Sequence, residues 1–81
     1  MSPRQKAQHA VTELKEATLE LLDEFPSGLR NVDVADKLDI RSNYLGRQQD
    51  YLSWSVLGLL LNERKVVRDG HLYVHSKHAE R

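Results

Sequence analysis

Cysteine is absent from this chain of 81 residues, so it can form neither a disulfide nor a zinc site with cysteine ligands. No apolar run approaches the roughly 20 residues that a membrane-spanning helix needs. Residues 1–6 are not followed by the apolar segment of a signal peptide. These absences predict a soluble cytoplasmic protein with no membrane partner.

An excess of charge of one sign is also missing, because 12 basic residues balance 12 acidic ones. Zero net charge counts against a generic basic DNA-binding protein. The distribution is uneven, however. Residues 1–40 hold five Lys or Arg against eight Asp or Glu, and residues 41–81 hold seven against four. Such a split can present a positive face to phosphates, although ordinary surface variation also produces a modest imbalance.

A chain of this length forms one domain. The last residues show no apolar periodicity, which is typical of a frayed end. We therefore predict one domain over residues 1–75 and a flexible C-terminal tail over residues 76–81.

The first predicted helix begins at Ser2, which can cap it, with Pro3 at its first position and Gln5 completing a capping box. It ends at residues 26–28, Pro-Ser-Gly. Its charged side is expected to face solvent, and a partner-binding role for that side is the less favoured alternative. Apolar or small residues recur along the other side at Ala7, Ala10, Val11, Leu14, Thr18, Leu21, Leu22 and Phe25.

Residues 29–40 contain the second predicted helix, with Asn31 as its cap. Ala35 lies on its inner side and allows a close helix crossing. Asp39 follows, at a position where helix-turn-helix sequences often have glycine. Aspartate tolerates the left-handed backbone conformation that this turn requires.

The third predicted helix, residues 53–62, is apolar almost all round, a pattern typical of a helix buried between two layers. We predict that Trp54 belongs to the core. Gly58 favours this interpretation, because glycine inside a helix is retained where another backbone comes close. The alternative is an exposed patch of Trp54 with Leu57.

The segment before this helix, residues 41–50, is polar and leaves two alternatives open. Either Ser42 or Asn43 caps a long helix, or the segment is a loop and the helix begins near Asp50. Gly46 keeps the second alternative open.

After the helix, residues 65–74 predict a hairpin with a two-residue turn at Asp69-Gly70. In this register Arg68 pairs with His71, and Arg68, His71 and Tyr73 share one face. The other face packs on the helices and consists of Val67, Leu72 and Val74.

Taken together, the pattern resembles the winged helix-turn-helix superfamily from Val11 to Val74. The resemblance implies a mainly α fold with a small antiparallel β-hairpin, that is, three helices plus a wing. The segment between Ile40 and Val56 is longer than in compact winged-helix regulators. With the Trp54 helix, this length is similar to winged-helix domains associated with modification-dependent restriction endonucleases. The resemblance rests on Gly28-Leu29-Arg30, Asp33-Val34-Ala35, Leu38-Asp39-Ile40, Val56-Leu57 with Leu60, and Lys65-Val66-Val67-Arg68-Asp69-Gly70.

In this superfamily the start of the recognition helix and the hairpin tip are the functional regions. Arginine can bind guanine, and asparagine or glutamine adenine, each through two hydrogen bonds in the major groove. Asp69 would be repelled by phosphate and is expected only to form the turn. The candidate nucleic-acid-binding residues are therefore Arg41, Ser42, Asn43, Tyr44, Arg47, Gln48, Gln49, Arg68 and His71.

The sequence contains no catalytic motif, so we predict neither an enzyme nor a cofactor. His71, His75 and His78 could bind zinc, but His71 leaves the hairpin turn and the other two lie in the last residues, which show no apolar periodicity, so we predict no metal site. The predicted partner is double-stranded DNA, bound by a small transcriptional regulator or a DNA-reading domain. Because the chain is neutral, tight binding would need a homodimer or a larger protein partner. The alternative is a winged-helix protein–protein interaction module without DNA binding, using Trp54, Leu57 and Leu61 or the hairpin edge.

Overall fold

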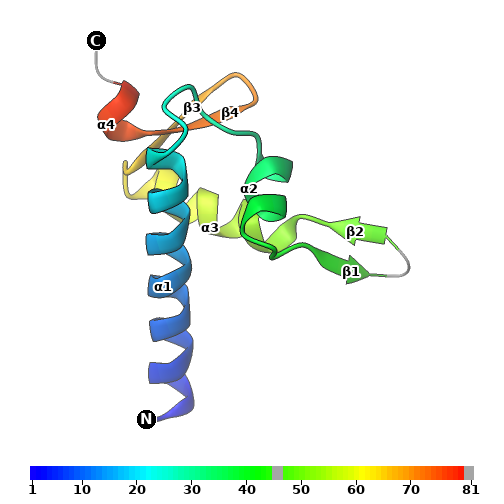
Figure 1. Cartoon of the computed structure of the whole chain (residues 1–81). Helices are drawn as coiled ribbons and strands as arrows, with labels where there is room; N and C mark the ends of the chain where they lie inside the picture. The colour runs from blue at the N-terminus through cyan, green and yellow to red at the C-terminus, as the bar shows by residue number, and fades with distance from the viewer. Residues whose placement is uncertain (45–46, 80–81) are drawn as a thin grey trace.

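The computed structural model describes residues 1–44 and 47–79, and for residues 43, 44 and 47–49 it describes the backbone only. The described part is mainly helical with short antiparallel hairpins, which confirms the predicted class and adds a second hairpin (Figure 1). The elements are α1 (Pro3–Asp23), α2 (Asn31–Lys37), β1 (Ser42–Tyr44), β2 (Arg47–Gln49), α3 (Tyr51–Asn62), β3 (Val66–Asp69), β4 (Leu72–His75) and α4 (Ser76–Ala79).

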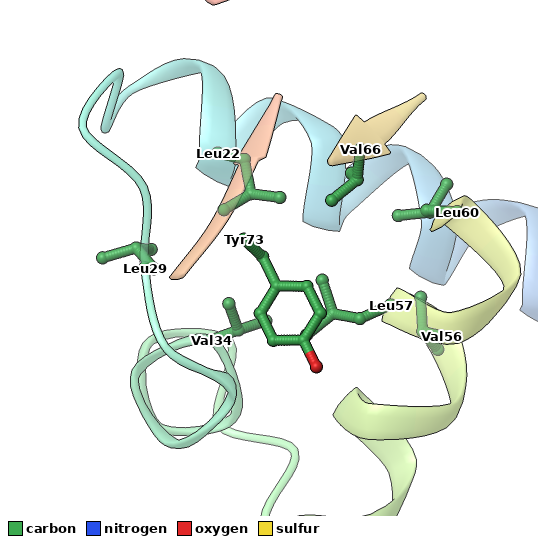
Figure 2. Packing of buried hydrophobic residues seen from close by; sticks show 8 residues of the cluster. All are labelled: Leu22, Leu29, Val34, Val56, Leu57, Leu60, Val66 and Tyr73. Atoms are coloured by element: carbon green, nitrogen blue, oxygen red, sulfur yellow. The ribbon is translucent and has the colours of Figure 1, made fainter. Parts of the chain in front are cut away.

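The core lies where α1, α2, α3 and the β3–β4 hairpin meet (Figure 2). Leu57 and Leu60 of α3 are fully buried, and Tyr73 is only 5% exposed. Burying a large apolar side chain contributes about 1.5–3 kcal/mol to stability, so this cluster supplies the main driving force for folding. Its members are Leu22, Leu29, Val34, Val56, Leu57, Leu60, Val66 and Tyr73.

Helix α1 begins as predicted. The Ser2 hydroxyl accepts a hydrogen bond from the Gln5 backbone N–H at 3.1 Å, and the Gln5 side chain accepts one from the Ser2 N–H at 3.0 Å. The C-terminal half of the helix packs on the core. The N-terminal half projects away from the domain, and all of residues 1–13 are exposed (Figure 1). The apolar side predicted for α1 therefore extends beyond the core that covers it.

Helices α2 and α3 end in the same way, each with a non-glycine residue in the left-handed conformation. Asp39 has φ 55°, which confirms the turn conformation predicted for it. Arg64 has φ 61°, which the sequence did not indicate. Beyond each of these residues a backbone N–H returns to the helix, from Ile40 to the Ala35 carbonyl at 2.9 Å and from Lys65 to the Leu60 carbonyl at 3.0 Å.

Helix α3 begins at Tyr51, so the long-helix alternative is wrong and the start near Asp50 is confirmed. Its buried side consists of Ser53, Val56, Leu57 and Leu60. The prediction of a helix buried on both sides is wrong, because α1, α2 and β3 all pack against this one side.

The prediction of a core Trp54 is also wrong, since this side chain is 61% exposed. The close backbone predicted at Gly58 is absent from the described part of the structure. Gly58 is exposed, and a Cβ atom placed on it would have no neighbour within 4 Å among the described residues. An apolar pattern all round a helix does not say how many sides are covered.

The predicted register of the β3–β4 hairpin is wrong, because the two-residue turn lies one residue further along the chain. Asp69 pairs with Leu72 and Arg68 with Tyr73, so the two-residue turn is Gly70-His71. The physical reason is the backbone of Gly70, whose φ is +63°. A turn with a positive φ at its first central residue places glycine there, and Asp69 remains in the strand.

The inward face of this hairpin also differs from the prediction. Val66 and Tyr73, on the opposite face, are 1% and 5% exposed and join the core. The predicted core face is covered in part, because Val74 is 7% exposed whereas Val67 is 36% exposed. Val66 and Tyr73 are covered because β3 packs on α3 and β4 on α1. Strand β4 also has a second neighbour. Leu29 forms an antiparallel bridge with Tyr73, with N–H to carbonyl distances of 3.0 and 2.7 Å.

Gly28 permits this bridge. Its φ is +96°, and a Cβ atom there would lie 2.8 Å from Cγ2 of Val74 and 3.0 Å from the carbonyl oxygen of Tyr73. The loop from α1 can approach β4 this closely only because Gly28 has no side chain.

The C-terminal segment differs from the predicted flexible tail. Ser76–Ala79 form the short helix α4, which returns to the end of α1. The Lys77 Nζ and His78 Nε2 atoms lie 2.9 and 2.8 Å from the two carboxylate oxygens of Asp23. The hydrogen bonds from Lys77 and then His78 lower the pKa of Asp23. Among the described helices, none has both the length and the apolar character needed to cross a bilayer.

Candidate nucleic-acid interface

A shallow concavity of about 530 Å³ lies between the start of α2, the start of α3 and the β3–β4 turn. It brings together two of the predicted site residues, Arg68 and His71, with the end of the β1–β2 segment at Asp50. It also includes residues that the sequence did not indicate as functional. Its lining is Arg30, Asn31, Val32, Asp50, Trp54, Arg68, His71 and Tyr73.

Arg68 supplies the uncompensated positive charge of this concavity. Its guanidinium donates to the Gly70 carbonyl at 3.1 Å and lies 5.3 Å from the centre of the Tyr73 ring. Among the described residues, no carboxylate oxygen lies within 4.0 Å of it. Because Tyr73 is held in the core, the cation–π contact positions Arg68 at the rim while leaving its charge available to an anion.

Arg30 is the second arginine of the concavity, and it is not among the predicted nucleic-acid-binding residues. Its Nε and Nη2 atoms lie 3.1 and 3.2 Å from the two carboxylate oxygens of Asp33, a bidentate pair one turn apart. The hydrogen bond from Arg30 lowers the pKa of Asp33. The Asp33 carboxylate also accepts a hydrogen bond from the Arg30 backbone N–H at 3.2 Å, at the start of α2, so the charge of Arg30 is balanced locally.

Asn31 connects α2 to the start of α3. It is the first residue of α2 and not its cap, so that prediction is wrong. Its Nδ2 donates to the Asp50 carbonyl at 3.2 Å, and its Oδ1 accepts a hydrogen bond from the Ser53 hydroxyl at 2.6 Å. Ser53 is 1% exposed, so this is a buried polar connection. Sequence patterns could not reveal it, because the partners lie about twenty positions apart.

Arg41 was predicted to contact bases, but its Nε forms an ion pair with the Asp50 carboxylate at 3.0 Å. Both side chains are largely covered, with 28% and 23% of their surfaces exposed. Arg41 and Asp50 flank the β1–β2 hairpin, so this pair closes its base. The structure therefore gives Arg41 a structural contact in place of a free guanidinium.

The other predicted residues of this segment do not lie on a helix, so the prediction of a recognition-helix start is wrong for them. They form the β1–β2 hairpin, which projects from α2 and α3 (Figure 1). Both short strands consist of consecutive polar residues without the alternation typical of a strand, and the sequence offered no Asn-Gly or Asp-Gly turn that would have revealed a hairpin. The pairs are Ser42 with Gln49, Asn43 with Gln48, and Tyr44 with Arg47. Apart from Ser42, their side chains lie outside the described part of the structure.

The outer face of α3 is apolar. Its twelve residues include no charged side chain, and large apolar groups are exposed on it. Tyr51 and Trp54 line a second hollow of about 320 Å³ together with Asn31 and Asp50. Leu52 and Leu59 are 43% and 41% exposed. Trp54 thus borders both hollows, between the cationic rim and an apolar helix face.

The three C-terminal histidines are not gathered at one point. His71 lines the concavity, whereas the rings of His75 and His78 meet edge to face with their centres 5.9 Å apart. Within residues 1–44 and 47–79, no group of three potential ligands is arranged to hold a metal ion.

Comparisons of the chain with protein-family models, with curated proteins and with solved structures give no match. The site must therefore be judged on its own chemistry. It combines a free guanidinium and an imidazole with an exposed indole, a set that suits an anionic ligand with flat aromatic groups.

Proposed function

We propose that this chain is a double-stranded DNA-binding module of the winged helix-turn-helix type. The observation that carries the proposal is the position of Arg68, which has no carboxylate partner among the described residues and lies beside His71 at the rim of the concavity. The order of elements supports the same proposal, because three helices are followed by a hairpin that also pairs with Leu29.

In this proposal the hairpins, and not the exposed side of α3, make the polar contacts. Helix α3 has no cation to meet a phosphate, whereas Arg68 and His71 can bind phosphate oxygens. The β1–β2 segment contains Asn43, Arg47 and Gln48, residue types that hydrogen-bond to base edges. Because the chain has zero net charge, a single copy should bind with modest affinity.

The test is a titration of mixed-sequence duplex DNA at several salt concentrations. Arg68→Ala should weaken binding about equally for all sequences and reduce the slope of log affinity against log salt by about 1, because one phosphate contact is lost. Lys65→Ala is the matched control. It also removes one positive charge, but Lys65 follows the C-terminal end of α3, whereas the concavity lies at the start of this helix. Trp54 is the only tryptophan, so its fluorescence reports directly on the concavity.

Arg47→Ala tests the second hairpin. It should change the preference among duplex sequences, because a base contact carries sequence information and a phosphate contact does not. If Arg47→Ala and Arg68→Ala both leave the binding isotherm unchanged, the assigned DNA-binding surface is wrong.

The second candidate is a protein-interaction module, which the exposed Tyr51, Leu52, Trp54 and Leu59 favour. It makes the opposite prediction for the same titration. Duplex DNA at low salt should then move neither the Trp54 emission nor the backbone amide signals of residues 66–75.

A further inference from the structure

We propose that the projecting half of α1 pairs with the same segment of a second copy of this chain, in antiparallel orientation. This inference does not depend on DNA binding. It starts from a mismatch within α1, whose apolar side continues through Ala7, Ala10 and Val11 although the domain's own core stops at Leu14.

The projecting segment, residues 3–13, begins with a complete capping box, but its described contacts all lie within the helix itself. Apart from the capping box and the backbone hydrogen bonds of the helix, two side-chain contacts are described for residues 3–13. They are the hydrogen bond from the Thr12 hydroxyl to the Gln8 carbonyl and the His9–Glu13 pair. A helical segment of this length without tertiary packing is marginal in water. A second helix against its apolar side would supply the missing packing.

The shape of this side is self-complementary when two copies run in opposite directions. A two-fold axis between Ala10 and Val11 places Ala7 opposite Leu14 of the second copy, and Ala10 opposite its Val11. Each small residue then faces a larger one, which is the arrangement that fills space between helices. A shallow hollow of about 300 Å³ already lies over Ala7 and Val11.

Charge fixes the orientation. Lys6 and Glu13 are two helical turns apart and therefore lie on the same flank of the apolar side. In the antiparallel pair each Lys6 lies near Glu13 of the other copy, which gives two opposite-charge contacts by symmetry. A parallel pair would set this flank against the opposite flank of the other copy, so that Lys6 and Glu13 would not meet. The occupant that fits this flank is thus a second, antiparallel copy.

The experiment is a charge exchange followed by analytical ultracentrifugation of the full chain. The parent protein should show a concentration-dependent dimer. Lys6→Glu alone and Glu13→Lys alone should each weaken association about tenfold, because two attractive contacts become repulsive. A mixture of the two single variants, or the double variant, should restore it. Glu16→Lys, on the opposite side of the same helix, is the matched control and should leave association unchanged.

The orientation and the surface are tested separately. Because the chain has no cysteine, Ala10→Cys should give a disulfide-linked dimer under mild oxidation, whereas Ala7→Cys should not, since its two copies lie too far apart along the antiparallel axis. Trp54 emission should not change on dimerisation. A strictly monomeric parent, association that ignores the charge exchange, or a blue shift of Trp54 emission on association would each overturn the proposal.

Discussion

The two β-hairpins of this protein are alike in size but are held in different ways. Strands β3 and β4 bury Val66 and Tyr73 in the core, and β4 also pairs with Leu29. The contacts described for the β1–β2 hairpin lie at its base, where Arg41 pairs with the Asp50 side chain and Asn31 binds the Asp50 carbonyl.

The comparison shows how the same local unit can serve two purposes. A two-stranded hairpin is marginally stable by itself and takes its stability from whatever it packs on. The β3–β4 hairpin completes the core, and its exposed residues include Arg68 in β3 and His71 in the turn. The β1–β2 hairpin contributes no residue to the described core.

The largest expected effect comes from a substitution in the β3–β4 hairpin, whose Val66 and Tyr73 belong to the core. Tyr73→Ala should lower the free energy of unfolding by about 3–5 kcal/mol, because it leaves a large cavity between β4 and α3. Trp54→Ala is the comparison among aromatic residues and should change it by roughly 0.5 kcal/mol or less, since Trp54 is exposed. Urea unfolding of both variants measures the difference. Equal losses would contradict the burial described for these two rings.

Gly28 and Gly70 both have a positive φ, and their substitution tests two different constraints on the β3–β4 hairpin. Gly70→Ala should cost about 1–2 kcal/mol for the left-handed backbone alone, because a Cβ atom there meets nothing within 4 Å in the described part of the chain. Gly28→Ala should cost about 1–3 kcal/mol more, since its Cβ atom would overlap Val74 and push Leu29 away from β4. Thermal unfolding of the two variants side by side ranks them. A milder loss for Gly28→Ala would argue against the Leu29 bridge.

The base of the other hairpin depends on Asn31. Asn31→Ala should lower the free energy of unfolding by about 1–3 kcal/mol, because the buried Ser53 hydroxyl loses one hydrogen-bond acceptor and the Asp50 carbonyl loses a donor. Asn62→Ala, an exposed amide at the other end of α3, is the control. Amide hydrogen exchange should speed up at Asp50 and the residues after it in Asn31→Ala but not in the control.

The smallest effect concerns α4, which follows β4 directly. The pKa of Asp23 is lowered in the folded protein by Lys77 and His78, so its contribution to stability is present above the ordinary aspartate pKa and is lost as the pH falls through the lower folded pKa. Asp23→Asn should remove this pH dependence and release Lys77 at neutral pH. Nuclear magnetic resonance of the Lys77 and His78 side chains follows both changes. An unchanged acid titration in Asp23→Asn would show that another group is responsible.

Several features of the fold could be predicted because they depend on residues that lie close together along the chain. The capping box of Ser2 and Gln5, the left-handed Asp39 and the existence of a hairpin after α3 all followed from local backbone chemistry. Each of these requires information from only a few positions along the chain.

Tertiary structure alone decided the features that depend on what lies opposite. Trp54 is exposed because α3 is covered on one side, and Tyr73 is buried where β4 packs on α1 and joins the core, whereas Val67 stays exposed. The hydrogen bonds of Asn31 and the ion pair of Asp23 likewise join distant segments. An apolar or polar pattern states which residues could be covered, but the cover comes from elements far away in the sequence, and their positions are set only when the whole core packs.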